Sequence, residues 1–120
     1  METLEFEKLV RQVISEIPAG LRQFMDNVDV LVDERPSNDQ LVGSGIEKDQ
    51  VLLGLYEGLP LTEREDYGNV LPDRITIFQE GIEGCCTSDE EILAEVRETV
   101  VHEIAHHFGI SDERLKELGI

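Results

Sequence analysis

The sequence predicts an α+β fold with N-terminal helices, a small three-stranded sheet, one long helix and a short C-terminal helix. Three observations support this prediction. Apolar residues recur at helical spacing near the N-terminus, short apolar runs follow in the middle of the chain, and a strongly capped helical pattern fills the last third. With 120 residues, of which 40% are hydrophobic, the chain is long enough for one core and is expected to form a single domain over residues 1–120.

The first third of the chain predicts two helices and a strand. Apolar residues at positions 6, 9, 10, 13, 14 and 17 indicate a helix over residues 3–17, and Pro18 suits the first turn of a second, short helix that ends near residue 27. Residues 28–33 alternate valine or leucine with aspartate and predict a strand with one buried face. The Ser, Asn, Asp and Gly residues of the segment 36–50 indicate a long loop.

Two further strands and two helices are expected in the remainder. Residues 51–56 (VLLGLY) and 74–79 (RITIFQ) predict strands, joined by an extended connection over 58–73 in which residues 62–65 can form a single helical turn. The strand 74–79 could also pair with an extended substrate as an added strand. Ser88 and Glu91 make a capping box that opens a helix running to about residue 108, and a last short helix spans 112–118.

Composition and charge exclude several classes of partner. The 27 acidic residues outnumber the 10 basic ones, giving a net charge of -17, which disfavours binding to nucleic acid and to anionic membrane surfaces. The two cysteines are adjacent, at positions 85 and 86, and cannot form a disulfide framework, so a reducing compartment is expected. Neither a signal peptide nor an apolar run of membrane length is visible, and a cytoplasmic location is therefore expected.

The pattern His102-Glu103-x-x-His106 is the strongest functional signal. Residues four apart on a helix lie on the same side, so both imidazoles can reach one ion, with the Glu103 carboxylate beside them. Gly109 suits a left-handed helix stop, after which Asp112 can return toward the same point. Two nitrogens and one oxygen would hold zinc and leave a fourth position for water. The sequence therefore predicts a zinc hydrolase, in the first instance a peptidase.

Neighbouring residues leave alternatives open. Asp112 can instead cap the last helix, and Glu113 is a rival third ligand. His107 projects about 100° away from the zinc side by helical geometry and is expected to pack against, or hydrogen bond to, another segment. Glu95 and Glu98 lie on the ligand side one to two turns earlier, where solvated charge is the default and support of the imidazoles the alternative. The opposite side carries an apolar stripe that should anchor the helix: Leu93, Val96, Val100, Ile104 and Phe108.

Larger segments resemble a known family. HExxHxxGxxD resembles the metzincin signature HExxHxxGxxH, and the segments 52–65, 71–79 and 99–115 resemble the minimal zincin family of small bacterial proteins, described as zinc-dependent metallopeptidases. This resemblance implies a zincin catalytic domain reduced to its core, with Asp112 at the position of the third ligand. The chain ends before the Met-containing turn and C-terminal subdomain of metzincins. A homo-oligomer or a protein partner is therefore expected to complete the cleft for a peptide or protein substrate.

The expected mechanism assigns proton transfer to Glu103, which takes the proton of the zinc-bound water and hands it to the leaving amine. Tyr56, Tyr67 and Arg74 are candidates to stabilise the oxyanion. Two alternatives remain: a non-catalytic metal-binding interaction module derived from a zincin, and a zinc hydrolase of another class, such as an RNA-processing enzyme. The acidity of the chain counts against RNA as a substrate.

Overall fold

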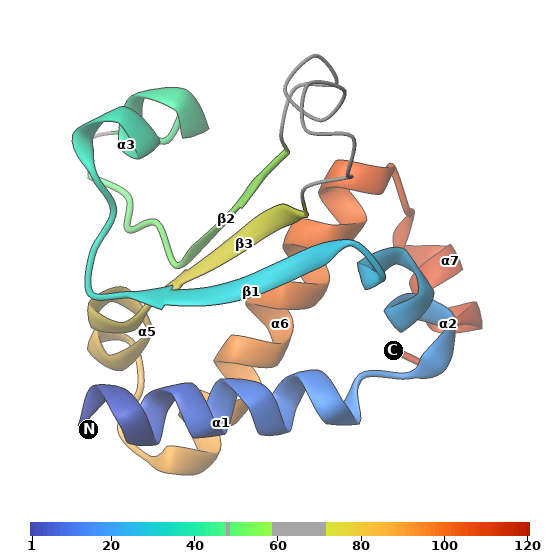
Figure 1. Cartoon of the computed structure of the whole chain (residues 1–120), viewed down its shortest axis with the longest axis horizontal. Coiled ribbons are helices and arrows are strands. Elements are labelled where there is room, and N and C mark those ends of the chain that lie inside the picture. Colours follow the sequence, from blue (N-terminus) through green and yellow to red (C-terminus); the bar gives the residue numbers. More distant parts are fainter. Residues whose placement is uncertain (48, 59–71) are drawn as a thin grey trace.

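The computed structural model describes residues 1–47, 49–58 and 72–120 (Figure 1). Its helices and strands, in chain order, are α1 (Thr3–Glu16), α2 (Ala19–Arg22), the 3-10 helix η1 (Gln23–Met25), β1 (Val28–Asp33), α3 (Asn38–Ser44), β2 (Gly54–Glu57), β3 (Asp73–Phe78), α5 (Gln79–Gly84), α6 (Asp89–Phe108) and α7 (Asp112–Glu117). The predicted α+β architecture, with a three-stranded sheet, a long helix and a short last helix, is confirmed. None of the described helices combines the length and apolarity that crossing a bilayer requires.

The sheet has the strand order β1-β3-β2, with β3 in the centre. β1 runs parallel to β3, with Val30 opposite Ile75, and β2 runs antiparallel to β3, with Tyr56 opposite Ile75 on the other side. The prediction that the strand 74–79 pairs with a substrate is wrong, because β1 and β2 already occupy both of its edges. The edge strand next to the long helix is β2.

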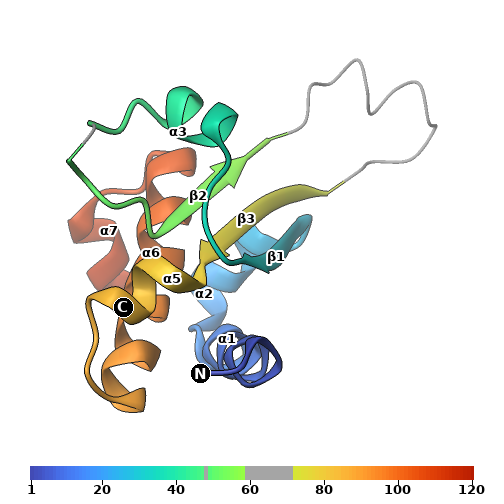
Figure 2. The ribbon, with the colours of Figure 1, turned by 90° about the vertical axis from the view of Figure 1, so that its left-hand side faces the viewer.

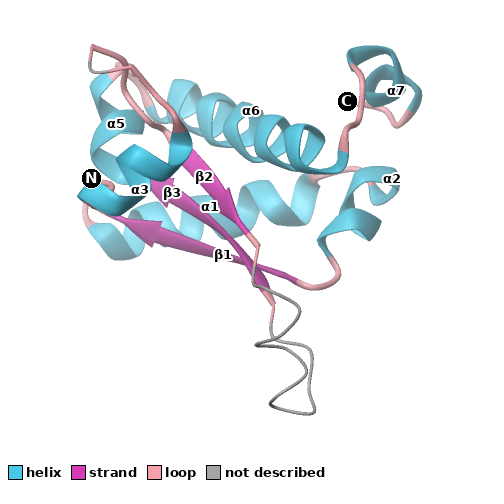
Figure 3. Cartoon of the chain, turned by 90° about the horizontal axis from the view of Figure 1, so that it is seen from above, coloured by secondary structure: helices cyan, strands magenta, loops and turns pink. Residues whose placement is uncertain are grey.

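The core lies between one face of the sheet and the helices α1 and α6, which pack against each other beneath it (Figures 2 and 3). The alternation predicted for β1 is present, with Val28, Val30 and Val32 turned toward this core. Helix α3 lies on the other side of β2, where Gln40 Nε2 donates to Glu57 Oε1 at 2.9 Å. The side chains that fill the core are fully or almost fully buried: Phe6, Val10, Val13, Ile17, Leu21, Ile75, Ile77, Ile82, Ile92, Val96, Val100, Val101 and Ile104.

Two helices were not predicted. The segment expected to be a loop contains α3, which a capping box starts: Ser37 Oγ accepts from the Gln40 amide at 3.1 Å, and Gln40 Oε1 accepts from the Ser37 amide at 3.0 Å. After β3 the chain enters α5 directly, and burial of Ile82 in the core compensates for the low helix propensity of its two glycines. The first residue of β2 is Gly54 rather than residue 51. The helical turn expected at 62–65 lies outside the described residues.

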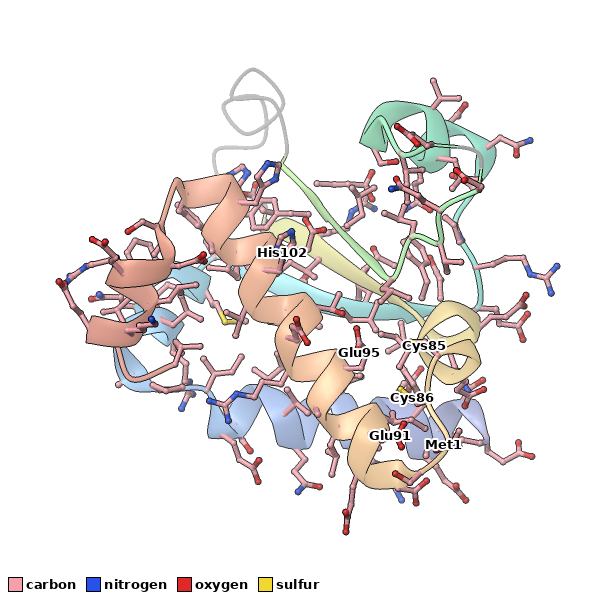
Figure 4. The ribbon with its side chains drawn as sticks, turned by 180° about the vertical axis from the view of Figure 1, so that it is seen from behind. Met1, Cys85, Cys86, Glu91, Glu95 and His102 are labelled. Carbon is pink, nitrogen blue, oxygen red and sulfur yellow. The ribbon has the colours of Figure 1, made fainter. Side chains whose placement is uncertain are left out.

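The two adjacent cysteines follow α5 and are free thiols, as expected, with 4.0 Å between their Sγ atoms (Figure 4). Cys85 is exposed, whereas Cys86 is partly buried against the core. Desolvation by burial, assisted by the neighbouring Cys85 thiol and by Glu95 and Glu91, raises the pKa of Cys86 to about 11. Cys86 is therefore a neutral thiol at physiological pH.

Candidate metal centre

Helix α6 starts where the sequence predicts, and its cap differs in one detail. Ser88 Oγ accepts a hydrogen bond from the Glu91 amide at 3.1 Å, as in a capping box. The Glu91 carboxylate, however, turns to Thr87, whose hydroxyl and amide donate to it at 2.8 and 3.1 Å. Together with Asp89 and Glu90 in the first turn, this arrangement satisfies the start of the helix and places negative charge at its positive end.

The buried side of α6 fixes the direction of the helix. Val96, Val100 and Ile104 of the predicted stripe are fully buried, but Phe108 at its end is 41% exposed. The buried side is wider than predicted and includes Ile92, Thr99, Val101 and Ala105. Gly109 ends the helix with φ +65°, the left-handed conformation that favours glycine, so the predicted helix stop is confirmed.

His102 and His106 are both exposed on the other side of this anchored helix. Their rings are nearly parallel, with 6.2 Å between the ring centroids and 10° between the ring planes. Two imidazoles that bind one zinc ion through bonds of about 2.1 Å at a tetrahedral angle have centroids about 5 Å apart. The difference of about 1 Å can be closed by rotation of exposed side chains. The two imidazoles therefore come within reach of one zinc ion only after such a rotation.

The side chain of Glu103 extends from α6 toward β2 and is partly buried. Desolvation raises the pKa of its carboxyl group, while a hydrogen bond from the Tyr56 backbone amide and the nearby imidazoles of His102 and His106 act to lower it. The carboxylate is thus attached to the edge strand β2. Sequence reasoning missed this contact, because a backbone amide donor leaves no signature in the residue types.

The third ligand predicted for the metal is the least defined part of the site. Asp112 is the exposed first residue of α7, and Ser111 caps that helix by accepting from the Arg114 amide at 3.1 Å. Across residues 1–47, 49–58 and 72–120, no three His, Cys, Asp or Glu side chains are gathered closely enough to hold one metal ion. Ligation by Asp112, and the alternative of Glu113, remain predictions.

His107 contacts another segment, as expected. Its imidazole stacks on the ring of Tyr56, with 3.8 Å between ring centroids and 15° between planes. The Tyr56 hydroxyl donates to Asp73 Oδ2 at 2.6 Å. The guanidinium of Arg74, another candidate for the oxyanion, lies 3.9 Å from the Glu57 carboxylate. The third candidate, Tyr67, lies outside the described residues.

A small cavity of about 210 Å³ adjoins the motif. Its lining consists of the segment 52–54 together with residues of α6, namely Glu95, Glu98, Thr99, His102 and Glu103. Figure 4 labels two of them, His102 and Glu95, on α6. Larger hollows, of about 610 and 760 Å³, lie away from the histidines and Glu103. The smaller cavity is the relevant one, because it alone of these three is bordered by the motif. Sequence patterns did not indicate the wall formed by residues 52–54.

Comparison with known proteins identifies the family and supports the fold. The sequence profile of the zincin-like metallopeptidase family matches residues 25–120, which include β1, the edge strand and the whole of α6. The chain belongs to this family. A solved structure, that of a conserved hypothetical protein from Thermus thermophilus, superposes with a TM-score of 0.58 at 23% sequence identity, covering 90% of this chain and 94% of the other. That likeness shows the fold alone. Curated protein sequences gave no significant match.

Proposed function

We propose that this chain is a zinc-dependent metallopeptidase in which His102 and His106 hold the metal and Glu103 is the general base. The observation that carries the proposal is the placement of these three side chains. Two exposed imidazoles and one partly buried carboxylate occupy the same side of a helix whose other side is fixed in the core. Membership of the zincin-like metallopeptidase family supports the same function.

The metal and the side chains would supply different parts of the reaction. When bound, zinc supplies a Lewis acid that polarises the scissile carbonyl and acidifies a coordinated water. Glu103 has the side-chain type and the position to accept the proton of the attacking water and to deliver it to the leaving amine. Its partly buried location between α6 and β2 limits exchange of that proton with bulk solvent.

An extended peptide is the substrate that this arrangement accommodates. β2 is an edge strand, with β3 on one side and no further strand on the other among the described residues. A peptide laid along β2 would pass the cavity bordered by His102 and Glu103, and it would gain main-chain hydrogen bonds from the outward-facing groups of β2 other than the Tyr56 amide, which binds Glu103. A second copy of the chain or a protein partner would provide the part of the cleft that so small a domain cannot supply.

The test combines metal analysis with hydrolysis of a broad peptide library. Purified protein should bind one zinc ion per chain and cleave peptides, and His106→Ala should lose both properties. Glu103→Gln should retain zinc and lose at least about 100-fold in kcat, the usual contribution of a general base. Glu90→Gln makes the same change at an exposed position of α6 and is the matched control. Full activity in Glu103→Gln would contradict the assignment.

A second candidate is a non-catalytic metal-binding module. Zinc bound at one equivalent with no cleavage of any library peptide would support this alternative. Comparison of Asp112→Ala with Glu113→Ala by zinc titration then assigns the third ligand, because only loss of the true ligand weakens binding strongly.

A further inference from the structure

Tyr56 contacts the metal-motif helix at two points. Its backbone amide donates to the Glu103 carboxylate, and its ring stacks on His107 with 3.8 Å between centroids. Glu103 and His107 are four residues apart and therefore lie one above the other on α6. A single residue of β2 thus contacts α6 over one full turn of the helix.

The side chain of Tyr56 makes two further contacts. Its hydroxyl donates to Asp73 Oδ2 at 2.6 Å, at the start of the central strand. Its edge meets Phe108, with 6.0 Å between centroids and 87° between planes, and Phe108 in turn packs on Phe24 at 5.3 Å. This aromatic group joins η1, β2 and the last turn of α6. Among the rings that contact Tyr56, that of His107 is nearest in sequence to the motif, because His107 directly follows His106.

We infer that His107 is a positioning residue: its stack on Tyr56 fixes β2 against α6, so that the Tyr56 amide holds the Glu103 carboxylate in one orientation. His107 is exposed and contributes little to the core, which leaves alignment of the strand as its structural effect. The effect needs an aromatic face and no imidazole nitrogen. The spectroscopic test below rests on the structure alone, whereas the kinetic test rests on the proposed function.

The first test follows the Tyr56 amide by NMR hydrogen exchange. In Glu103→Ala the Tyr56 resonance should shift and its exchange should accelerate, because its acceptor is removed. In His107→Ala the same amide should exchange about tenfold faster, given the usual strength of an aromatic pair. In His107→Phe exchange should stay within about twofold of the wild type. The Phe78 amide, which donates to Leu53 O at 2.9 Å at the far end of the strand pair, is the internal control.

Two outcomes of this experiment would overturn the inference. In one, exchange at Tyr56 is unchanged in His107→Ala. In the other, the Tyr56 and Phe78 amides accelerate equally, which would indicate general destabilisation rather than a local loss of alignment. Arg97→Ala, at an exposed position of the same helix, should leave both amides unchanged.

The second test uses peptide hydrolysis. His107→Ala should lower kcat about tenfold while zinc content stays unchanged, because both histidine ligands remain and the base loses its orientation. His107→Phe should restore kcat. If His107→Phe is as slow as His107→Ala, the imidazole itself is needed and the positioning role is refuted. If the wild type cleaves nothing, the proposed function fails, while the exchange experiment still decides the inference.

Discussion

Replacement of Gly54 by alanine should destabilise the protein, because β2 crosses α6 too closely at this residue to leave room for a side chain. A β-carbon built on Gly54 would lie 2.5 Å from Thr99 Cγ2 and 3.3 Å from Thr76 O. Carbon atoms in favourable contact are about 3.5–4.0 Å apart, so an overlap of about 1 Å must be relieved. Thr99 cannot easily rotate away, since its hydroxyl donates to Glu95 O at 2.8 Å and the residue is buried.

The expected loss in the free energy of unfolding is the usual cost of overpacking, about 1–3 kcal/mol. This loss is reduced slightly because alanine restricts the unfolded chain more than glycine does. An unfolding entropy of about 2.1 cal/mol/K per residue corresponds, for 120 residues, to about 4 °C in Tm per kcal/mol. After that reduction the net cost is about 0.5–2.5 kcal/mol, so Gly54→Ala should lower Tm by about 2–10 °C. Gly43→Ala, in α3 with no atom within 4 Å of its β-carbon, should leave Tm unchanged or raise it by a few degrees.

A double-mutant cycle with Thr99→Ser tests whether contact with the Thr99 methyl group causes the destabilisation by Gly54→Ala. Serine removes the clashing methyl group and keeps the hydroxyl that bonds to Glu95 O, at a cost of about 0.5–1.5 kcal/mol for the lost methyl. Urea denaturation of the two single variants and the double variant should show that the double is more stable than additivity predicts, by about 1 kcal/mol or more. Additive effects, or a Gly54→Ala variant as stable as the wild type, would refute the close approach of β2 to α6.

Three further perturbations test the cap of α6, the packing of α6 in the core and the burial of Cys86. Ser88→Ala removes the cap of α6 and should cost about 1 kcal/mol, or about 4 °C in a thermal melt. Ile104→Ala, at a fully buried position beside Glu103, should cost about 2–5 kcal/mol in urea denaturation, whereas Val42→Ala, at an 82% exposed position, should cost less than about 0.5. Desolvation by burial is the largest cause of the raised pKa of Cys86 and persists when Cys85→Ser leaves Cys86 as the single cysteine. Iodoacetamide at pH 8 should therefore alkylate Cys86 in that variant several-fold more slowly than an ordinary thiol, and an equal rate would show that this thiol is not desolvated.

The sequence predicted α6 and its motif well, because the signals are local. Ser88 at the start, Gly109 at the end and apolar residues at helical spacing between them each act within one or two turns of chain. The exposure of His102 and His106 on one side follows from the same periodicity. The N-terminal helix and β1 were predictable for the same reason, since each carries a regular apolar pattern.

Features that depend on contacts between distant segments were not predictable. β2 starts at Gly54, where the strand approaches Thr99 of α6, and no pattern within residues 51–56 encodes that approach. Helix α5 contains two glycines in six residues and is held by burial of Ile82 against a core that forms elsewhere. The link from the Tyr56 amide to Glu103 likewise joins residues 47 positions apart through a main-chain atom. The start of α3, by contrast, could have been predicted from the sequence, because Ser37 and Gln40 form a local capping-box pattern that the prediction of a loop overlooked.

The family profile begins at residue 25, yet five fully or almost fully buried side chains precede that point: Phe6, Val10, Val13, Ile17 and Leu21. Burial of each contributes roughly 1.5–3 kcal/mol, so together they match the whole net stability of a typical domain, about 5–15 kcal/mol. A recombinant fragment cut at the homology boundary would expose the apolar underside of α6 to water and should aggregate. The segment that the family profile matches is therefore shorter than the unit that folds, and an expression boundary for this chain is better placed ahead of α1 than at β1.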